Sequence, residues 1–234
     1  MKHRTIVVTG SSSGIGRAIT ETLLKAGAEV VGLARNHEKF TPEVSHYKYY
    51  KVDISDLENL PKTFLKILKN HPKVDGFVSN AGYGDFKSLE NFSPTQIISY
   101  LNTNLTSHII MTRLLLPFMK KQKSGKIIFI GSEAAIRGAQ KGSIYNAAKF
   151  GLRGFSQSIR EESSNSNIHV SIVNPGMVRT QFFEKLNFGP GEDKTNAIEP
   201  SDIAEVIVNI LNMRHGTVID EINLSPLKKV IKFD

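Results

Sequence analysis

Residues 4–16 read RTIVVTGSSSGIG, an apolar run that leads directly into a glycine-rich turn. The β-branched run predicts a buried strand, and the periodicity of residues 15–26 predicts a helix directly after the turn. A strand, a glycine turn and a helix N-terminus suit a pyrophosphate group, because they provide backbone without Cβ and amide donors at the positive end of the helix dipole. Gly10, Gly14 and Gly16 are spaced Gly-x-x-x-Gly-x-Gly, which differs from the Gly-x-Gly-x-x-Gly of the usual dinucleotide fingerprint. The place of this turn in the chain nevertheless favours nucleotide binding over a simple tight turn.

The alternation of strand and helix patterns continues along the chain. Further strands are predicted at residues 28–33, 47–54, 74–79, 126–130, 168–173 and 218–224, and further helices within residues 55–70, 93–121, 145–163 and 200–212. Such alternation favours right-handed βαβ units and a parallel sheet. The fold prediction is an α/β fold, with residues 1–234 as a single Rossmann-like doubly wound domain of about seven parallel strands. Residues 176–199 are the one long irregular stretch, which predicts a substrate-lid loop within that domain.

The composition limits the class of protein. The 234 residues are 40% hydrophobic, which suits one compact domain or at most two small ones. Cysteine is absent, which fits a reducing compartment. No apolar run approaches the roughly 20 residues needed to span a bilayer, and the apolar stretch after the basic start is too short for a secretory signal. We therefore predict a cytoplasmic protein without a membrane partner, and the scattered histidines predict no metal site.

The formal net charge of +8 raises the question of a nucleic-acid partner. The lysines are spread along the chain and do not alternate with exposed aromatic residues. This pattern favours a solvated surface over nucleic-acid binding, and a positive field would also attract an anionic cofactor.

The end of the second predicted strand, Leu33-Ala34-Arg35-Asn36, carries no carboxylate. At this place an acidic residue accepts a hydrogen bond from the ribose 2′-hydroxyl of NAD, whereas an arginine accommodates the 2′-phosphate of NADP. The Arg35 guanidinium is a fork suited to phosphate. The sequence therefore predicts NADP (NADPH) as the cofactor, with an ordinary surface role for Arg35 as the alternative.

Tyr145 and Lys149 lie four residues apart in a predicted helix, thirteen residues after Ser132. This spacing places both side chains on one helix face. The ordinary pKa of a phenol is about 10, and a neighbouring ammonium lowers it by favouring the phenolate. The pair therefore suits proton exchange, and a serine hydroxyl could hold a substrate oxygen beside it. On their own, such pairs are common on solvated helix faces.

Several motifs in order point to one family. They are TGSSSGIG at residues 9–16, SNAG at residues 79–82, Asn104, Ser132, Tyr145-x-x-x-Lys149, and Asn174-Pro175-Gly176 through Thr180. This combination covers nearly the whole chain and resembles the short-chain dehydrogenase/reductase family. The resemblance implies an NADP(H)-dependent oxidoreductase that interconverts a carbonyl and an alcohol by hydride transfer.

The resemblance also implies roles for the matching residues. Tyr145 would exchange a proton with the substrate oxygen, Lys149 would lower the Tyr145 pKa and bind the nicotinamide ribose, and Ser132 would polarise the substrate carbonyl. Asn104 would kink its helix and hold a water in a proton relay to Lys149. The residues implied to contact the cofactor are Gly10, Ser12, Ser13, Gly14, Ile15, Gly16, Arg35, Asp53, Ile54, Asn80, Ala81, Gly82, Tyr145, Lys149, Pro175, Gly176, Val178 and Thr180.

Simpler alternatives stay open at three of these positions. Asn104 is alternatively a helix-break residue, Asn80 a turn former, and Asp53 a helix-start residue. Ser79 also departs from the family pattern, since it replaces the first Asn of Asn-Asn-Ala-Gly. Ser13 stands where many NADP-specific relatives carry a basic residue.

The substrate is not named by the sequence. The C-terminal region lacks the Asp-Gly-Gly ending of typical ketoacyl-carrier-protein reductases. The alternative functions are a 3-ketoacyl-thioester (acyl-carrier-protein) reductase and a non-catalytic NADP(H)-binding sensor. The expected partners are a small-molecule carbonyl or alcohol substrate and further copies of the chain, in a homodimer or homotetramer formed through the helices that contain Asn104 and Tyr145. The apolar residues Phe182, Phe183, Leu186 and Phe188 either contact the substrate or only pack the lid onto the domain.

Overall fold

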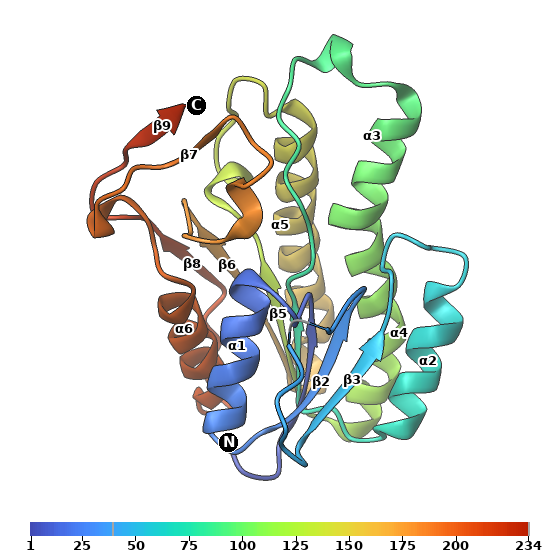
Figure 1. Cartoon of the computed structure of the whole chain (residues 1–234). Coiled ribbons are helices and arrows are strands. Elements are labelled where there is room, and N and C mark those ends of the chain that lie inside the picture. The colour runs from blue at the N-terminus through green and yellow to red at the C-terminus, as the bar shows by residue number, and fades with distance from the viewer. Residues whose placement is uncertain (39, 234) are drawn as a thin grey trace.

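The computed structural model describes residues 1–38 and 40–233, and its centre is a sheet of seven parallel strands with helices on both faces (Figure 1). The strand order is β3-β2-β1-β4-β5-β6-β8. The strands of this sheet are β1 (Thr5–Thr9), β2 (Glu29–Ala34), β3 (Tyr47–Lys51), β4 (Gly76–Ser79), β5 (Gly125–Ile130), β6 (Ile168–Pro175) and β8 (Glu221–Leu224). The α-helices are α1 (Gly14–Lys25), α2 (Leu60–Asn70), α3 (Pro94–Leu101), α4 (Ser107–Gln122), α5 (Ser143–Ser163) and α6 (Pro200–Asn212). All seven predicted strands are present, so the predicted fold class is confirmed, with strand ends displaced by up to three residues.

The strand order reverses at β1, which pairs with β2 on one side and with β4 on the other. In doubly wound sheets, ligands bind outside the carboxyl ends of the strands at such a reversal. The carboxyl ends of β1, β4 and β5 therefore mark the edge where a functional site is expected.

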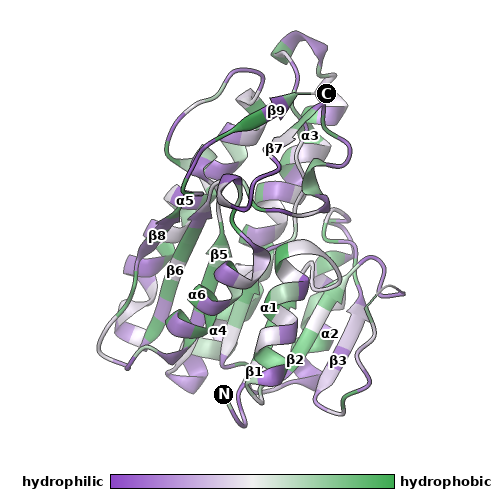
Figure 2. Ribbon diagram, turned by 60° about the vertical axis from the view of Figure 1, so that its left-hand side comes forward, coloured by the Kyte–Doolittle hydropathy of each residue, from purple (hydrophilic) through white to green (hydrophobic). Residues whose placement is uncertain are grey.

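Two apolar clusters cover the two faces of the sheet. Val7 packs with residues of α2, α4 and α5, whereas its neighbours Ile6 and Val8 pack with residues of α1 and α6. Because both faces are covered, the central strands are apolar at nearly every position. Figure 2 shows this hydrophobic colour along β5 and β6.

Helix starts follow their local signals. Ser93 and Gln96 form a capping box at the start of α3, and Pro61 lies in the first turn of α2, where proline is favoured. The helix predicted over residues 93–121 is not continuous, however. A π-helical turn, η2 (Asn102–Thr106), separates α3 from α4.

The prediction that residues 176–199 are irregular is wrong in part. This segment contains the short helices η5 (Gln181–Phe183) and η6 (Lys194–Asn196) and the strand β7 (Phe188–Pro190). β7 pairs antiparallel with a strand that the sequence did not predict, β9 (Ile231–Phe233). The C-terminal segment therefore folds back beside residues 188–190 and supplies hydrogen-bonding partners for their backbone (Figure 1).

Candidate functional site

The glycine turn lies between β1 and α1, at the edge where the strand order reverses. Gly10 has a φ of +69°, and its amide donates to the Leu33 carbonyl at 2.7 Å. A Cβ on Gly10 would lie 2.8 Å from Asn80 Nδ2, so a larger residue would be both strained and crowded. Ser13 is the N-cap residue of α1, and its side chain accepts no bond from the first turn. The amides of that turn thus keep their donors for another partner.

A hollow of about 290 Å³ lies beside this turn. Its lining residues are Ser12, Ser13, Gly14, Arg17, Asn36 and Gln181. The first turn of α1 carries no acidic residue, and Arg17 is held there by Glu21 at 2.8 Å. Hydroxyls, a cation and a helix N-terminus form a donor set that fits phosphate groups.

Arg35 lies directly after β2, where it is exposed. Its charge acts on Asp53, which follows β3. Burial raises the pKa of Asp53, but hydrogen bonds from Ser55 and the Arg35 charge outweigh burial, so this pKa is lowered overall. Asp53 Oδ1 accepts from the Ser55 amide at 3.0 Å and from the Ser55 hydroxyl at 2.7 Å. Because α2 begins only at Leu60, the alternative that Asp53 starts this helix is wrong.

Asn80 and Ala81 tie the end of β4 to the end of β1. Both of their amides donate to Thr9 Oγ1, at 2.9 and 3.0 Å, and Asn80 Nδ2 donates to the Thr9 carbonyl at 2.9 Å. These bonds fit the turn-forming alternative for Asn80. Cofactor contact by Asn80, Ala81 and Gly82 stays a prediction.

Asn104 lies in the π-helical turn and is 1% exposed. Its Oδ1 accepts from the Tyr83 amide at 3.0 Å, and its Nδ2 donates to the Tyr100 carbonyl at 3.1 Å. The Tyr100 hydroxyl donates to the Tyr83 carbonyl at 2.8 Å. The break in the helix therefore anchors the loop after β4, whereas the water relay through Asn104 stays a prediction.

Ser132, Tyr145 and Lys149 come together at the carboxyl end of β5. Ser132 follows this strand and is buried, and Tyr145 and Lys149 lie on successive turns of α5. Lys149 Nζ donates to the Ile130 carbonyl at 2.9 Å and lies 5.9 Å from the centre of the Tyr145 ring. The spacing in the sequence thus corresponds to a shared location in the structure.

The electrostatics of this group differ from the sequence expectation. Burial raises the pKa of Tyr145 to about 12, which a hydrogen bond with Ser132 opposes and the Glu133 charge increases. Burial lowers the pKa of Lys149 to about 8. The expectation that the Tyr145 pKa is lowered is therefore wrong here, because burial of the phenol outweighs the effects that favour the phenolate.

The segment after β6 passes against the glycine turn. A Cβ on Gly14 would lie 3.5 Å from Thr180 Cβ. Thr180 Oγ1 accepts from the Phe182 amide at 3.2 Å, and the Gly176 amide donates to the Leu224 carbonyl at 2.8 Å. The remaining predicted cofactor residues are Ile15, which is partly buried, Gly16, Ile54 and Val178, which are buried, and Pro175, which ends β6.

The sequence model described as "short chain dehydrogenase" matches residues 4–190. The chain belongs to the short-chain dehydrogenase family.

Two curated relatives and one solved structure illustrate the similarity of this short-chain dehydrogenase to others. Sepiapterin reductase of Chlorobaculum tepidum is 30% identical over the whole of both chains. The 3-oxoacyl-[acyl-carrier-protein] reductase FabG of Buchnera aphidicola is 32% identical over 80% of this chain and 78% of its own. A metagenomic short-chain oxidoreductase solved in complex with NADP is 30% identical, with a TM-score of 0.82 over 97% of this chain and 99% of its own.

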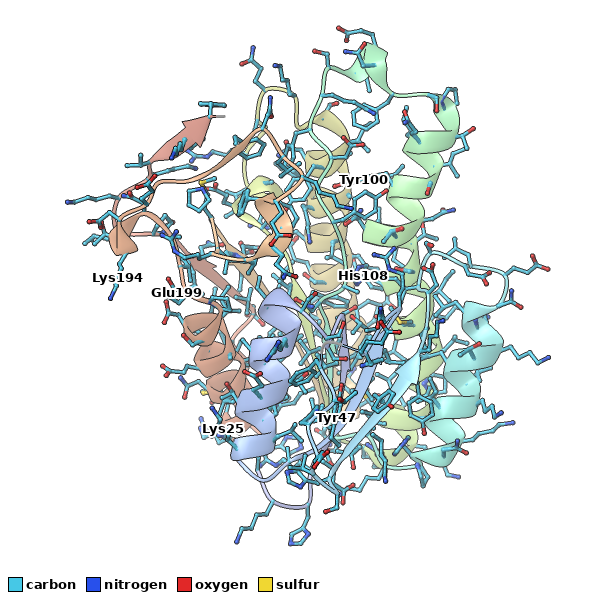
Figure 3. All side chains as sticks on the ribbon, in the orientation of Figure 1. Lys25, Tyr47, Tyr100, His108, Lys194 and Glu199 are labelled. Atoms are coloured by element: carbon cyan, nitrogen blue, oxygen red, sulfur yellow. The ribbon has the colours of Figure 1, made fainter. Side chains whose placement is uncertain are left out.

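The structure of this short-chain dehydrogenase adds residues that the sequence reasoning missed. Arg17 lines the hollow beside the glycine turn. A cationic residue in the first helical turn after the glycines is the sequence feature that could have predicted this. His108 lies on α4 (Figure 3) and is 1% exposed. It follows Asn104 of the π-helical turn by four residues. Its Nδ1 lies 2.6 Å from the hydroxyl of Ser79, the residue that departs from the family motif. Ser79 and His108 thus form a buried polar pair behind the SNAG turn.

A second hollow of this short-chain dehydrogenase, of about 300 Å³, lies at the amino ends of the strands. Arg4 donates there to the Leu211 carbonyl at 2.8 Å, and Lys126 donates to the Met213 carbonyl at 2.7 Å. Both cations therefore cap the end of α6, a structural role. Within residues 1–38 and 40–233, no helix is long and apolar enough to cross a membrane, and no group of three or more His, Asp or Glu side chains is placed to hold a metal ion.

Proposed function

We propose that this short-chain dehydrogenase is an NADPH-dependent oxidoreductase that interconverts a carbonyl compound and an alcohol, with Tyr145 as proton donor and acceptor. The observation that supports it most strongly is the convergence of Ser132, Tyr145 and Lys149 at the edge of the sheet that carries the glycine turn. Two relatives are named as reductases, and a similar solved structure contains NADP, which supports the same reaction class.

The residues around the glycine turn fit a dinucleotide. The backbone of Gly10 and Gly14 and the hydroxyls of Ser12 and Ser13 are proposed to hold the pyrophosphate, and Arg17 adds a cation at the same hollow. Arg35 is proposed to bind the 2′-phosphate and so to favour NADP over NAD. The proposed contacts to the adenine and nicotinamide halves are Asp53, Ile54, Asn80, Ala81, Gly82, Pro175, Gly176, Val178 and Thr180.

The proposed chemistry divides between the cofactor and the protein. When bound, the nicotinamide supplies or accepts the hydride. In the reductive direction, the Tyr145 hydroxyl donates its proton to the substrate oxygen, and Ser132 donates a hydrogen bond to the same oxygen as negative charge develops on it. Lys149 stabilises the phenolate that remains, because its charge lies beside the ring.

The protonation states of the structure suit reduction. With a pKa of about 12, Tyr145 carries its proton at neutral pH and is ready to donate it. With a pKa of about 8, Lys149 is mostly charged at neutral pH. Asn104 is proposed as a positioning residue, because it holds the loop after β4 against α3.

The test is a panel of ketones, aldehydes, hydroxy acids and acyl thioesters, assayed with NADPH or NADP⁺ by the change in NADPH absorbance. The expected result is turnover of a carbonyl substrate that falls about 100-fold or more in Ser132→Ala, since loss of one such donor costs that much. Ser158→Ala, at an exposed position of α5, is the matched control and should leave the rate unchanged. If the wild-type protein turns over no member of the panel, the proposed function is wrong.

A further inference from the structure

Tyr145 and three phenylalanine rings from separate segments of the chain form one set of ring contacts. We call Tyr145, Phe86, Phe182 and Phe188 the aromatic cluster. Phe86 comes from the loop after β4, Phe182 from η5 and Phe188 from β7. The Tyr145 ring centre lies 4.9 Å from that of Phe86 and 6.2 Å from that of Phe182, and the Phe86 ring lies 5.1 Å from that of Phe188. Phe86 therefore lies at the centre of a chain of ring contacts that ends at the phenol.

The rings of the aromatic cluster differ from those of the hydrophobic core. The core rings Phe64, Phe77 and Phe129 are fully buried. Every member of the aromatic cluster keeps partial exposure to solvent instead. The cluster thus presents apolar, aromatic surface beside the proposed proton donor, where a ligand can cover it.

The ring geometry favours a planar aromatic ligand. The pairs that Phe86 forms with Phe182 and Phe188 are edge-to-face, at interplanar angles of 73° and 83°, and its pair with Tyr145 is tilted at 46°. Rings in such arrangements attract one another beyond the effect of buried area, so a substrate ring gains more here than a saturated group of the same shape.

Three charged groups next to the aromatic cluster already have partners, and one of them, Lys149, donates to the Ile130 carbonyl at 2.9 Å. Glu133, adjacent to Ser132 in the chain, accepts from Lys229 at 2.6 Å. Asp85, adjacent to Phe86, pairs with Lys87 at 3.6 Å. An ionic substrate group would have to compete with these pairs, which favours an uncharged substrate.

Building on the proposed function, we propose that the substrate is an uncharged aryl ketone or aryl aldehyde. Its ring packs against the partly exposed surface of Phe86, Phe182 and Phe188, while its carbonyl oxygen faces Ser132 and Tyr145. The position of the substrate ring thus fixes the direction of its carbonyl group, because the proton donor Tyr145 is itself a member of the aromatic cluster.

The test compares acetophenone with cyclohexyl methyl ketone, two ketones that differ only in the aromaticity of the ring. Dissociation constants are measured by calorimetry on protein saturated with NADP⁺, which cannot reduce a ketone, and NADPH turnover is measured separately. If only the burial of apolar area contributed, cyclohexyl methyl ketone would bind as tightly as acetophenone or more tightly. The proposal predicts that acetophenone binds more tightly, and that Phe86→Leu and Phe182→Leu each reduce this preference by about 2- to 10-fold. Leucine keeps an apolar side chain at each position but removes the ring.

Phe233→Leu is the matched control, because Phe233 is 71% exposed and, among the described residues, its one ring contact with the aromatic cluster is with Phe188 at 6.4 Å. It should leave the preference unchanged. Equal or tighter binding of cyclohexyl methyl ketone by the wild-type protein overturns the inference, as does an unchanged preference in both Phe86→Leu and Phe182→Leu. If acetophenone binds with the predicted preference but NADPH reduces no carbonyl, the aryl site stands and the proposed function fails. If carbonyls are reduced without a ring preference, the proposed function stands and the aryl site fails.

Discussion

His108 predicts how the free energy of unfolding depends on pH. Its imidazole is 1% exposed and lies 2.6 Å, Nδ1 to Oγ, from Ser79. Burial, and then the Lys149 charge, lower the pKa of His108 to about 3, whereas a histidine in an unfolded chain has a pKa of about 6.5. Because the folded pKa is the lower one, this contribution to stability is fully present above about pH 6.5 and is lost as the pH falls toward about 3.

The size of the effect follows from these two pKa values. At about pH 5 the unfolded chain binds a proton at His108 that the folded protein does not, which lowers the free energy of unfolding by about 2 kcal/mol. The perturbation is His108→Gln, which removes the titrating group. The free energy of unfolding is measured with urea at about pH 7 and at about pH 5. Its decrease between these two pH values should be about 2 kcal/mol smaller in the variant than in the wild-type protein.

The comparison is made between the two pH values within each variant, so a general destabilisation by His108→Gln cancels. The other histidines with lowered pKa, at positions 37, 71 and 169, are present in both proteins and also cancel. His3→Gln, at an exposed position, is the control and should lose as much stability on acidification as the wild-type protein. If His108→Gln also loses as much as the wild-type protein, the buried neutral state of this imidazole is refuted.

Two further predictions concern the cofactor and the catalytic group. Arg35→Ala should weaken NADPH binding by about 10- to 100-fold and leave NADH binding unchanged, since hydrogen bonds between charged groups contribute about 1.5–3 kcal/mol. Equal losses of affinity for both cofactors in fluorescence titrations would rule out the phosphate contact. Arg214→Ala, near the amino end of β5, is the control. The kcat/KM of carbonyl reduction should fall above about pH 8, because Lys149 loses its charge there while Tyr145 keeps its proton. A kcat/KM that stays constant to well above this pH would contradict the proposed role of the Lys149 charge.

Much of the fold is predictable because its signals are local. Buried parallel strands appear as β-branched runs, and the start of α3 is encoded in the capping residues Ser93 and Gln96. The pairing of β7 with β9 has no such signal, since each strand has three residues and Phe188–Pro190 includes both Gly and Pro. The π-helical turn has no local signal either, because it goes with a hydrogen bond from the Tyr83 amide to Asn104, 21 residues away in the chain.

The candidate site shows the same division. The spacing of Tyr145 and Lys149 predicts a shared helix face, which the structure has. The direction of the Tyr145 pKa shift was not predictable, because it depends on how deeply the phenol is buried. The role of His108 was hidden for a similar reason, since its partner Ser79 belongs to another element.

Tyr145→Phe is the most direct test of the proposed chemistry, because it removes one hydroxyl and keeps the ring within the aromatic cluster. We expect the kcat of carbonyl reduction to fall by about 100- to 10,000-fold, the usual contribution of a positioned proton donor, while the dissociation constant for NADPH stays within about twofold of the wild-type value. Tyr49→Phe, at a side chain that is 52% exposed, should change neither quantity. If Tyr145→Phe reduces carbonyls at a rate close to that of the wild-type protein, Tyr145 is not the proton donor.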